Sequence, residues 1–287
     1  MMRLVCVVAV VLTFSAVVVG EEPKITPDLI YGRKDGMALT LDVVQPAKAN
    51  GAGILWIQSG GWYSRWVEPA QIAKASQGFL DKGYTMFIVR HGSAPKYAIP
   101  DAVDDVRLAV RFVRHKARDF GVDPERLGVM GGSAGGHLAL VLATTADEGN
   151  ANAKDPVLKQ TNRVACVAVL FPPTDISTWV DNPPEIIKKI PSLHPPLKFD
   201  AKLAPQLSPA LKATEKAAPS LMIHGDKDEL VPISHSQKMV EVLEKLKVPC
   251  KLVTVKGAAH GFSPKQNVEI IFPEMLKWYD THLKARE

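Results

Sequence analysis

The chain has 287 residues, 46% of them hydrophobic, and 35 Lys and Arg against 30 Asp and Glu, which gives a formal charge of +5. This length is too great for a disulfide-stapled miniprotein and sufficient for one well-buried core, so we expect one enzyme-sized domain. The apolar and charged fractions are near those of globular proteins, which excludes wholesale disorder. The basic excess is small and spread along the chain, so it predicts no nucleic-acid partner.

The first 20 residues differ in composition from the rest. Arg3 precedes an uncharged run at 4–19, rich in Val and Ala, and the chain turns polar at Glu21. This pattern predicts a secretory signal peptide at 1–20, cleaved after about Gly20. A membrane anchor is the alternative, but about 16 apolar residues fall short of the roughly 20 needed to span a bilayer. We therefore expect export to the periplasm or the extracellular space, a folded domain at 21–287, and no stable membrane span after cleavage.

Cleavage would remove Cys6 and leave two of the three cysteines, Cys166 and Cys250. Both lie in apolar runs that are typical of two separate strands. We expect two buried free cysteines rather than a disulfide, although an exported protein meets oxidising conditions.

Short apolar runs alternate with helical stretches along the remainder of the chain. The segment 37–44 alternates apolar and polar residues and stops before Pro46, which is typical of a strand near a sheet edge. The other predicted strands are continuous apolar runs of the kind buried on both faces of a parallel sheet, at 53–58, 84–90, 127–130, 164–171, 219–224 and 251–255. The alternation predicts an α/β protein with a doubly wound, mostly parallel sheet and right-handed crossovers.

One of the predicted helices, at 101–118, carries a basic stripe. Its valines recur at helical spacing, and the opposite stripe is formed by Arg107, Arg111, Arg114 and Arg118. We interpret this stripe as a solvated helix face, because any amphipathic helix shows a polar side. A patch that binds an anionic ligand is the alternative.

The segment 172–219 interrupts the alternation of strands and helices. It contains the proline pairs 172–173, 183–184 and 195–196, and it is too long for a connecting loop. We expect a lid-like insertion over the C-terminal edge of the sheet, where a substrate wall would lie.

A candidate nucleophile, Ser133, stands in the sequence Gly-Gly-Ser-Ala-Gly at 131–135. This G-x-S-x-G pattern follows the predicted strand 127–130 and precedes a helical run at 137–143. A nucleophile on a tight strand-to-helix turn needs small neighbours, because the serine backbone is strained and Cβ atoms beside it would collide. The turn exposes the hydroxyl and aims the helix N-terminus at a developing oxyanion.

A serine hydroxyl needs a base and an orienting acid, which in this type of sheet follow in the order acid and then histidine. Asp228 follows the predicted strand 219–224, and His260 follows the strand 251–255. Ligands bind beyond the C-terminal ends of such strands. The sequence predicts a triad of Ser133, Asp228 and His260, with Asp226 and Asp175 as less favoured acids.

Two other histidines have simpler interpretations. His224 ends a predicted strand, where we expect its hydrogen bonds to be satisfied locally. His137 lies at the start of a predicted helix, where it is expected to pack rather than act as a second base.

The oxyanion donors are predicted from two places. Ala134 follows the nucleophile and supplies one N–H, and Gly60 and Gly61 follow the strand 53–58, where glycines let the backbone approach a substrate oxygen. Trp62 and Tyr63 come next and are predicted to bind substrate. Together with Trp66, these aromatic rings either stack on an aromatic or sugar ring or pack the insertion down.

These segments resemble those of α/β-hydrolases of the esterase/lipase group, near the BD-FAE-like and prolyl oligopeptidase-like hydrolases. The resemblance covers about 31–283, and its most specific pieces are at 39–43, 59–62, 94–106, 131–139, 224–228 and 260–262. It implies a carboxylic ester hydrolase, with acetyl or feruloyl esters of plant polysaccharides among the substrates of the family. Relatives usually begin the oxyanion loop with His-Gly-Gly-Gly, whereas Gln58 and Ser59 occupy the first two positions here.

The predicted reaction is acyl transfer to Ser133 followed by hydrolysis, with a small-molecule or carbohydrate ester as substrate and no metal or organic cofactor. A serine peptidase of the prolyl oligopeptidase type and a non-catalytic binding protein with the same fold are the alternatives. The sequence predicts neither the acyl group, the alcohol nor the oligomeric state.

Overall fold

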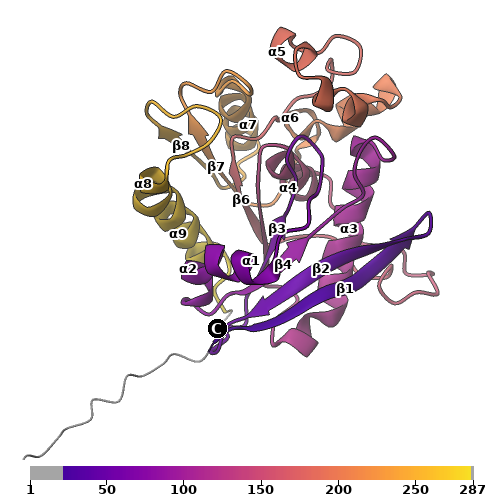
Figure 1. The fold of residues 1–287 in the computed structure, drawn as a ribbon, viewed down its shortest axis with the longest axis vertical. Coiled ribbons are helices and arrows are strands. Elements are labelled where there is room, and N and C mark those ends of the chain that lie inside the picture. The colour runs from indigo at the N-terminus through magenta and orange to yellow at the C-terminus, as the bar shows by residue number, and fades with distance from the viewer. Residues whose placement is uncertain (1–21, 286–287) are drawn as a thin grey trace, which may run out of the picture.

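A computed structural model describes residues 22–285, so the predicted signal peptide lies outside the described residues. The core is an eight-stranded sheet in the order β1-β2-β4-β3-β5-β6-β7-β8 (Figure 1). The strands are β1 (Lys24–Lys34), β2 (Met37–Gln45), β3 (Gly53–Ile57), β4 (Thr85–Val89), β5 (Leu127–Gly132), β6 (Cys166–Leu170), β7 (Ser220–Gly225) and β8 (Cys250–Val255). The six strands β3 to β8 are parallel to one another, while β1 and β2 are antiparallel to their neighbours.

The mostly parallel, doubly wound sheet confirms the predicted fold class. The strand at 37–44 is present as β2 and lies near a sheet edge as predicted, with only β1 outside it. No strand was predicted at β1, in which Tyr31 is the one buried residue and Pro27 lies within the strand. An exposed edge strand shows neither a buried run nor a strict alternation, which is why pattern reading missed it.

Helices cover both faces of the sheet (Figure 1). One core contains α3 (Ile99–Lys116), α4 (Ala134–Thr144) and α7 (Ser234–Lys245). The other contains α1 (Pro69–Ala75), α2 (Gln77–Leu80) and α9 (Phe272–His282). Successive β4 residues face opposite cores, Phe87 the first and Ile88 the second. Burial on both sides explains the continuous apolar runs in the central strands.

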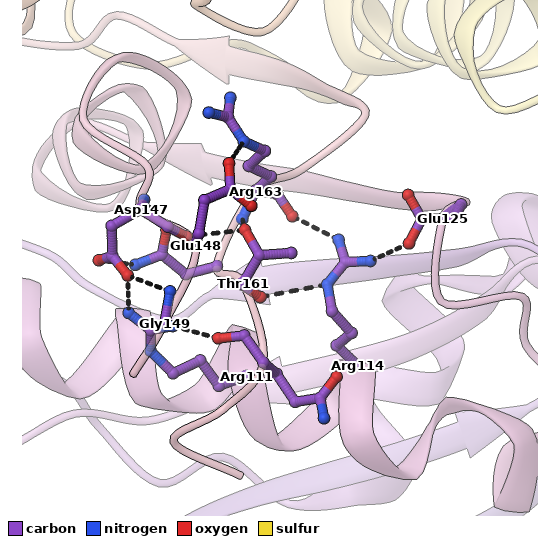
Figure 2. A network of polar contacts seen from close by, with 10 residues as sticks. Arg111, Arg114, Glu125, Asp147, Glu148, Gly149, Thr161 and Arg163 are labelled. Carbon is purple, nitrogen blue, oxygen red and sulfur yellow. Dashed lines mark hydrogen bonds and ion pairs between the residues drawn. The ribbon is translucent and has the colours of Figure 1, made fainter. Parts of the chain in front are cut away.

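The arginine stripe on α3 is not a solvated face, so that prediction was wrong for its central members. Figure 2 shows Arg111 bonded to Asp147. Arg111 also donates to the Gln160 carbonyl. Arg114 is 7% exposed and donates to Glu125 Oε1 at 2.6 Å and to three backbone carbonyls. Helical periodicity identified the shared face but gave no sign that the loop at 146–163 covers it.

The insertion (residues 172–219) consists of short turns of helix. They are α5 (Glu185–Lys188), η2 (Pro191–Leu193), η3 (Pro195–Leu197), η4 (Ala201–Leu207) and α6 (Pro209–Lys212). Figure 1 shows α5 and the neighbouring turns beyond the ends of β6 and β7, at the top of the view. Frequent prolines explain the short elements, because proline begins a helical turn well but does not continue one.

The two cysteines of the described chain are both free, as expected. Cys166 is buried, but Cys250 is only half-buried, which corrects the expectation for the second thiol. No helix within residues 22–285 is long and apolar enough to cross a membrane.

Candidate active site

Ser133 lies on the turn between β5 and α4 with a backbone that L-residues rarely adopt. Its φ is 51° and its ψ is −120°. The conformation is held by hydrogen bonds on both sides, from Ser133 N to Leu170 O and from His137 N to Ser133 O, each 2.9 Å long. Such strain persists only where the surrounding structure fixes it, and it is often found at active sites.

Glycine is required on both sides of Ser133. A Cβ at Gly131 would lie 2.4 Å from the backbone of Gly135, and one at Gly135 would lie 2.6 Å from Ile57 O. Both distances are far below van der Waals contact, so the turn closes only with glycine at these positions. The spacing in the sequence is therefore a packing requirement of the turn.

His260 follows β8 and connects the serine to an acid. Its Nδ1 lies 2.7 Å from Asp228 Oδ2, and its Nε2 lies 2.9 Å from Ser133 Oγ. A carboxylate accepts hydrogen bonds only, so Nδ1 carries the proton and Nε2 accepts from the serine hydroxyl. The structure brings together the three residues predicted as nucleophile, base and acid.

Asp228 has other hydrogen-bond partners besides His260. Its Oδ1 accepts from Leu230 N at 3.0 Å and Val231 N at 2.9 Å, and His224 Nε2 lies 3.2 Å from its Oδ2. Burial by itself raises the pKa of this carboxyl, but the hydrogen bonds from His224, His260 and Val231 outweigh burial and hold the pKa well below its usual value. The carboxylate therefore stays charged beside His260.

His224 is a contact that the sequence analysis missed. Its bonds to Ser236 Oγ at 2.7 Å and Val231 O at 2.8 Å are local, as expected. Its approach to Asp228, four residues along the chain, is local as well, but it connects the strand end to the predicted acid. We assign it the role of a positioning residue for the acid.

The alternative acids lie elsewhere. Asp175 pairs with Lys238 and accepts from the Ser177 hydroxyl, each at 2.6 Å. Asp226 accepts from Gly257 N at 2.6 Å and so shapes the turn before His260. Neither carboxylate contacts the His260 imidazole.

In the oxyanion loop (residues 58–64), one glycine N–H is occupied by a hydrogen bond and the next is open. Gly60 N–H donates to Tyr63 O at 3.0 Å, so its N–H is already in use, in contrast to the prediction. Gly61 has a φ of 58°, and its N–H has no protein acceptor within residues 22–285. Ala134 begins α4, where the first N–H groups have no partner within the helix. Gly61 and Ala134 therefore carry the amides that are open to a ligand.

A different histidine braces this loop. Ser59 Oγ lies 2.8 Å from His91 Nε2, and His91 Nδ1 lies 2.7 Å from Gly92 O. Burial lowers the pKa of His91 to about 4, so the ring is neutral, donates from Nδ1 and accepts from the Ser59 hydroxyl. His91 follows β4, so a residue from a neighbouring strand supports the loop that relatives begin with their own histidine.

Ser59→Ala is expected to lower kcat for ester hydrolysis by about three- to tenfold, because a lost buried hydrogen bond is worth about 1 kcal/mol. KM should change less, since the Ser59 hydroxyl is already bonded to His91 and acts by orienting the loop. Steady-state kinetics check this, with Thr281→Ala on α9 as the control for loss of a hydroxyl. Equal kcat values for Ser59→Ala and wild type would contradict the bracing role.

Two cavities meet at Ser133. The first, of about 300 Å³, is mostly apolar and is lined by Gly60, Gly61, Trp62, Ser133, Phe171, Pro173, Trp179, Ile187, Leu193, Leu230, Val231 and His260. The second, of about 590 Å³, is more polar and is lined by Trp56, Ile57, Gln58, Ser59, Gly60, Tyr63, Arg65, Val67, Met130, Gly131, Gly132, Ser133, Leu170 and Phe171. The insertion thus forms one wall of the apolar cavity, as its predicted position implied.

The aromatic residues of the oxyanion loop differ in their roles. Trp62 is 4% exposed and packs edge-on against Trp179 of the insertion, with 6.2 Å between ring centroids. Its Nε1 donates to His137 Nδ1 at 3.1 Å, and His137 Nε2 donates to Leu207 O at 2.7 Å. Trp62 therefore packs the insertion down and also lines the apolar cavity. Tyr63 lines the polar cavity, and Trp66 is 58% exposed.

Acid is expected to destabilise the fold through His137. Burial lowers its pKa to about 4, below the value of about 6.5 in an unfolded chain. The unfolded state therefore binds more protons between these values, and stability that is complete above about pH 6.5 falls as the pH drops to about 4. His137 contributes up to about 1.4 kcal/mol per pH unit in this window.

Urea unfolding across this window checks the expectation. His137→Gln should show a shallower dependence of the free energy of unfolding on pH than wild type, and exposed His115→Gln should show the wild-type dependence. The same slope in His137→Gln and wild type would be inconsistent with a neutral buried imidazole.

Comparisons with known proteins agree with this geometry. A sequence model of the BD-FAE family matches residues 41–243. An ethyl acetate hydrolase of Pseudomonas putida is 30% identical over 135 residues, which cover 45% of this chain and 42% of that protein. An acetylxylan esterase of Xylanibacter ruminicola is 34% identical over 103 residues, which cover 34% of this chain and 20% of that protein.

Similarity of fold extends further than similarity of sequence. The truncated form of a carbohydrate esterase from gut microbiota superposes with a TM-score of 0.74 at 21% identity, covering 91% of this chain and 97% of that one. The chain spans less than half the length of the two curated relatives. The family match covers more than half of the chain, and the sheet order, the strained serine turn and the solved neighbour all agree with it. The chain therefore belongs to the BD-FAE family and has the α/β-hydrolase fold.

Proposed function

We propose that the protein is a serine esterase that cleaves carboxylic esters through an acyl-enzyme. The observation that carries the proposal is the continuous hydrogen-bond path from Asp228 through His260 to Ser133, of 2.7 and 2.9 Å, next to two open amides. This arrangement of a nucleophile, a base and an orienting carboxylate is the one that acyl transfer requires.

In the proposed reaction, His260 Nε2 takes the proton of Ser133 while Oγ attacks the ester carbonyl. Gly61 N–H and Ala134 N–H donate to the oxyanion that forms. The protonated His260 then gives its proton to the leaving alcohol, which departs as the C–O bond breaks. Water, activated by the same imidazole, cleaves the acyl-enzyme and restores Ser133. Asp228 keeps Nδ1 protonated and stabilises the imidazolium.

The proposed substrates are acetyl or feruloyl esters of carbohydrates. Two similar proteins named above are an acetylxylan esterase and a carbohydrate esterase, which supports this class. The apolar cavity of about 300 Å³, with aromatic side chains on its walls, suits an apolar acyl group. The larger, more polar cavity suits the sugar that carries the ester.

An ester panel tests the proposal on the protein without residues 1–20. Acetyl, butyryl and feruloyl esters and acetylated xylan should be turned over, and a short X-Pro peptide should be cleaved more slowly than any of them. Faster cleavage of the peptide would favour the peptidase alternative. A fluorophosphonate probe should label wild type and not Ser133→Ala; a wild-type protein that resists the probe would be a binding protein.

Export remains part of the proposal. The composition of residues 1–20 supports a cleaved signal peptide, although these residues lie outside the described part of the chain. N-terminal sequencing of the protein recovered outside the cytoplasm should begin near Glu21. Recovery of the uncleaved chain in a membrane fraction would contradict cleavage.

A further inference from the structure

Arg65 stands alone as a fixed charge beside the proposed active site. It lines the cavity of about 590 Å³ that reaches Ser133, and also a neighbouring one of about 380 Å³ formed with Gly61, Ser192 and other residues. Apart from His260, the described residues around these cavities and the apolar one are otherwise uncharged. Arg65 is therefore the one permanently charged side chain among the described residues that line these three cavities.

Within the described chain, this charge has no ion-pair partner. Five arginines form ion pairs within residues 22–285, and they are Arg90, Arg107, Arg111, Arg114 and Arg163. Arg65 forms none there, and no carboxylate lines the cavities that it borders. An arginine that stabilised the fold through an ion pair would resemble Arg90, which holds Asp42 at 2.6 Å.

The backbone that carries Arg65 is fixed relative to the nucleophile. The preceding residue, Ser64, donates from Oγ to Gln58 O at 2.7 Å and from N to Ser93 Oγ at 2.8 Å. Tyr63 closes the hairpin with Gly60 one residue earlier. Arg65 thus starts from a rigid loop, and its exposed side chain can reach a ligand without a rearrangement of that loop.

We propose that Arg65 is a specificity residue that binds an anionic group, such as a carboxylate, on the ester substrate. The inference rests on the proposed esterase function and narrows its substrate class to esters that carry a negative charge near the scissile bond. A planar guanidinium donates two parallel hydrogen bonds to a carboxylate, which fixes the orientation of the substrate as well as its affinity. Gln58, Tyr63 and Ser192 supply further hydrogen-bonding groups along the same walls.

Two matched pairs of esters test the inference. The first pair places the charge in the alcohol half, as 4-acetoxybenzoate against 4-acetoxybenzamide. The second places it in the acyl half, as the p-nitrophenyl monoester of adipic acid against p-nitrophenyl hexanoate. For each pair, the charge preference is kcat/KM of the charged ester divided by that of the neutral one. The pair that responds shows which half of the substrate carries the anion.

Three variants separate charge from structure. Arg65→Gln should lower the charge preference by about tenfold in at least one pair, as expected for loss of a charge-assisted hydrogen bond. Arg65→Lys should keep most of it, and Arg118→Gln, which removes an exposed arginine of the short turn η1 (Ala117–Phe120) after α3, should keep all of it. In about 1 M NaCl, wild type should lose much of its preference, whereas Arg65→Gln should not respond to salt.

The outcomes are distinguishable. An unchanged preference in Arg65→Gln for both pairs would overturn the role of Arg65 and leave the esterase proposal standing. If wild type hydrolysed none of the four esters, the result would contradict the proposed function itself, and the inference would fall with it.

Discussion

Ser133→Ala is expected to lower kcat for p-nitrophenyl acetate by about 10⁴-fold or more, because the reaction then has no nucleophile and retains only binding and the oxyanion donors. The measurement is initial-rate kinetics on purified protein, together with fluorophosphonate labelling. Unchanged turnover in Ser133→Ala would remove this residue from the mechanism.

Ser133→Gly separates chemistry from strain. It should be as inactive as Ser133→Ala, since neither has a hydroxyl. Glycine accepts the φ of 51° without the Cβ conflict, so this variant should be more stable than wild type by about 1 kcal/mol in urea unfolding. A glycine variant less stable than wild type would show that the strain at this turn is smaller than the conformational entropy that glycine adds to the unfolded chain.

Asp228→Asn is expected to lower kcat by about 10³- to 10⁴-fold with little change in KM. The amide oxygen would keep the bonds from Leu230 N and Val231 N, so the amide NH₂ would face His260 Nδ1. Nδ1 must then accept, Nε2 carries the proton, and the imidazole is unable to take the proton of Ser133. The substitution therefore changes the tautomer of His260 and leaves the positions of the three side chains largely unchanged.

Asp175→Asn is the matched control, because Asp175 is one of the two less favoured acids, with Asp226, that the sequence analysis names. Its carboxylate pairs with Lys238 and not with His260, so kcat should stay within about threefold of wild type. Circular dichroism of both variants checks that they are folded. A large loss in Asp175→Asn with an active Asp228→Asn would show that the acid is misassigned.

The parts that could be predicted from sequence are those with local causes. The glycines around Ser133 are needed by the turn itself, and Asp228 and His260 each follow a buried strand, so chain order located them. Ser59 and His91 were not paired in advance, because their contact joins the ends of two different strands. The approach of His224 to Asp228, four residues along the chain, was not predicted either, because spacing alone does not show which way the loop after β7 turns.

The errors have a common physical origin. Periodicity shows which residues share a helix face but does not show what packs on that face, so Arg114 was expected in solvent. The N–H of Gly60 is occupied because residues 60–63 form a tight hairpin. A Gly-Gly pair in the sequence does not show which of its two N–H groups points into the hairpin and which points outward. The edge strand β1 was missed for the opposite reason, because it buries too little to leave a pattern.

The hydrogen bonds from Trp62 to His137 and from His137 to Leu207 matter for engineering of this family. One imidazole, with no exposed surface, ties the loop beside the nucleophile to the segment that walls the acyl cavity. Because the acceptor in the insertion is a backbone carbonyl, a chimera that exchanges 172–219 keeps this link only if the new segment places a carbonyl where Leu207 O lies. Exchange of the insertion between relatives therefore depends on the path of its backbone beside His137 more than on the identity of residue 207.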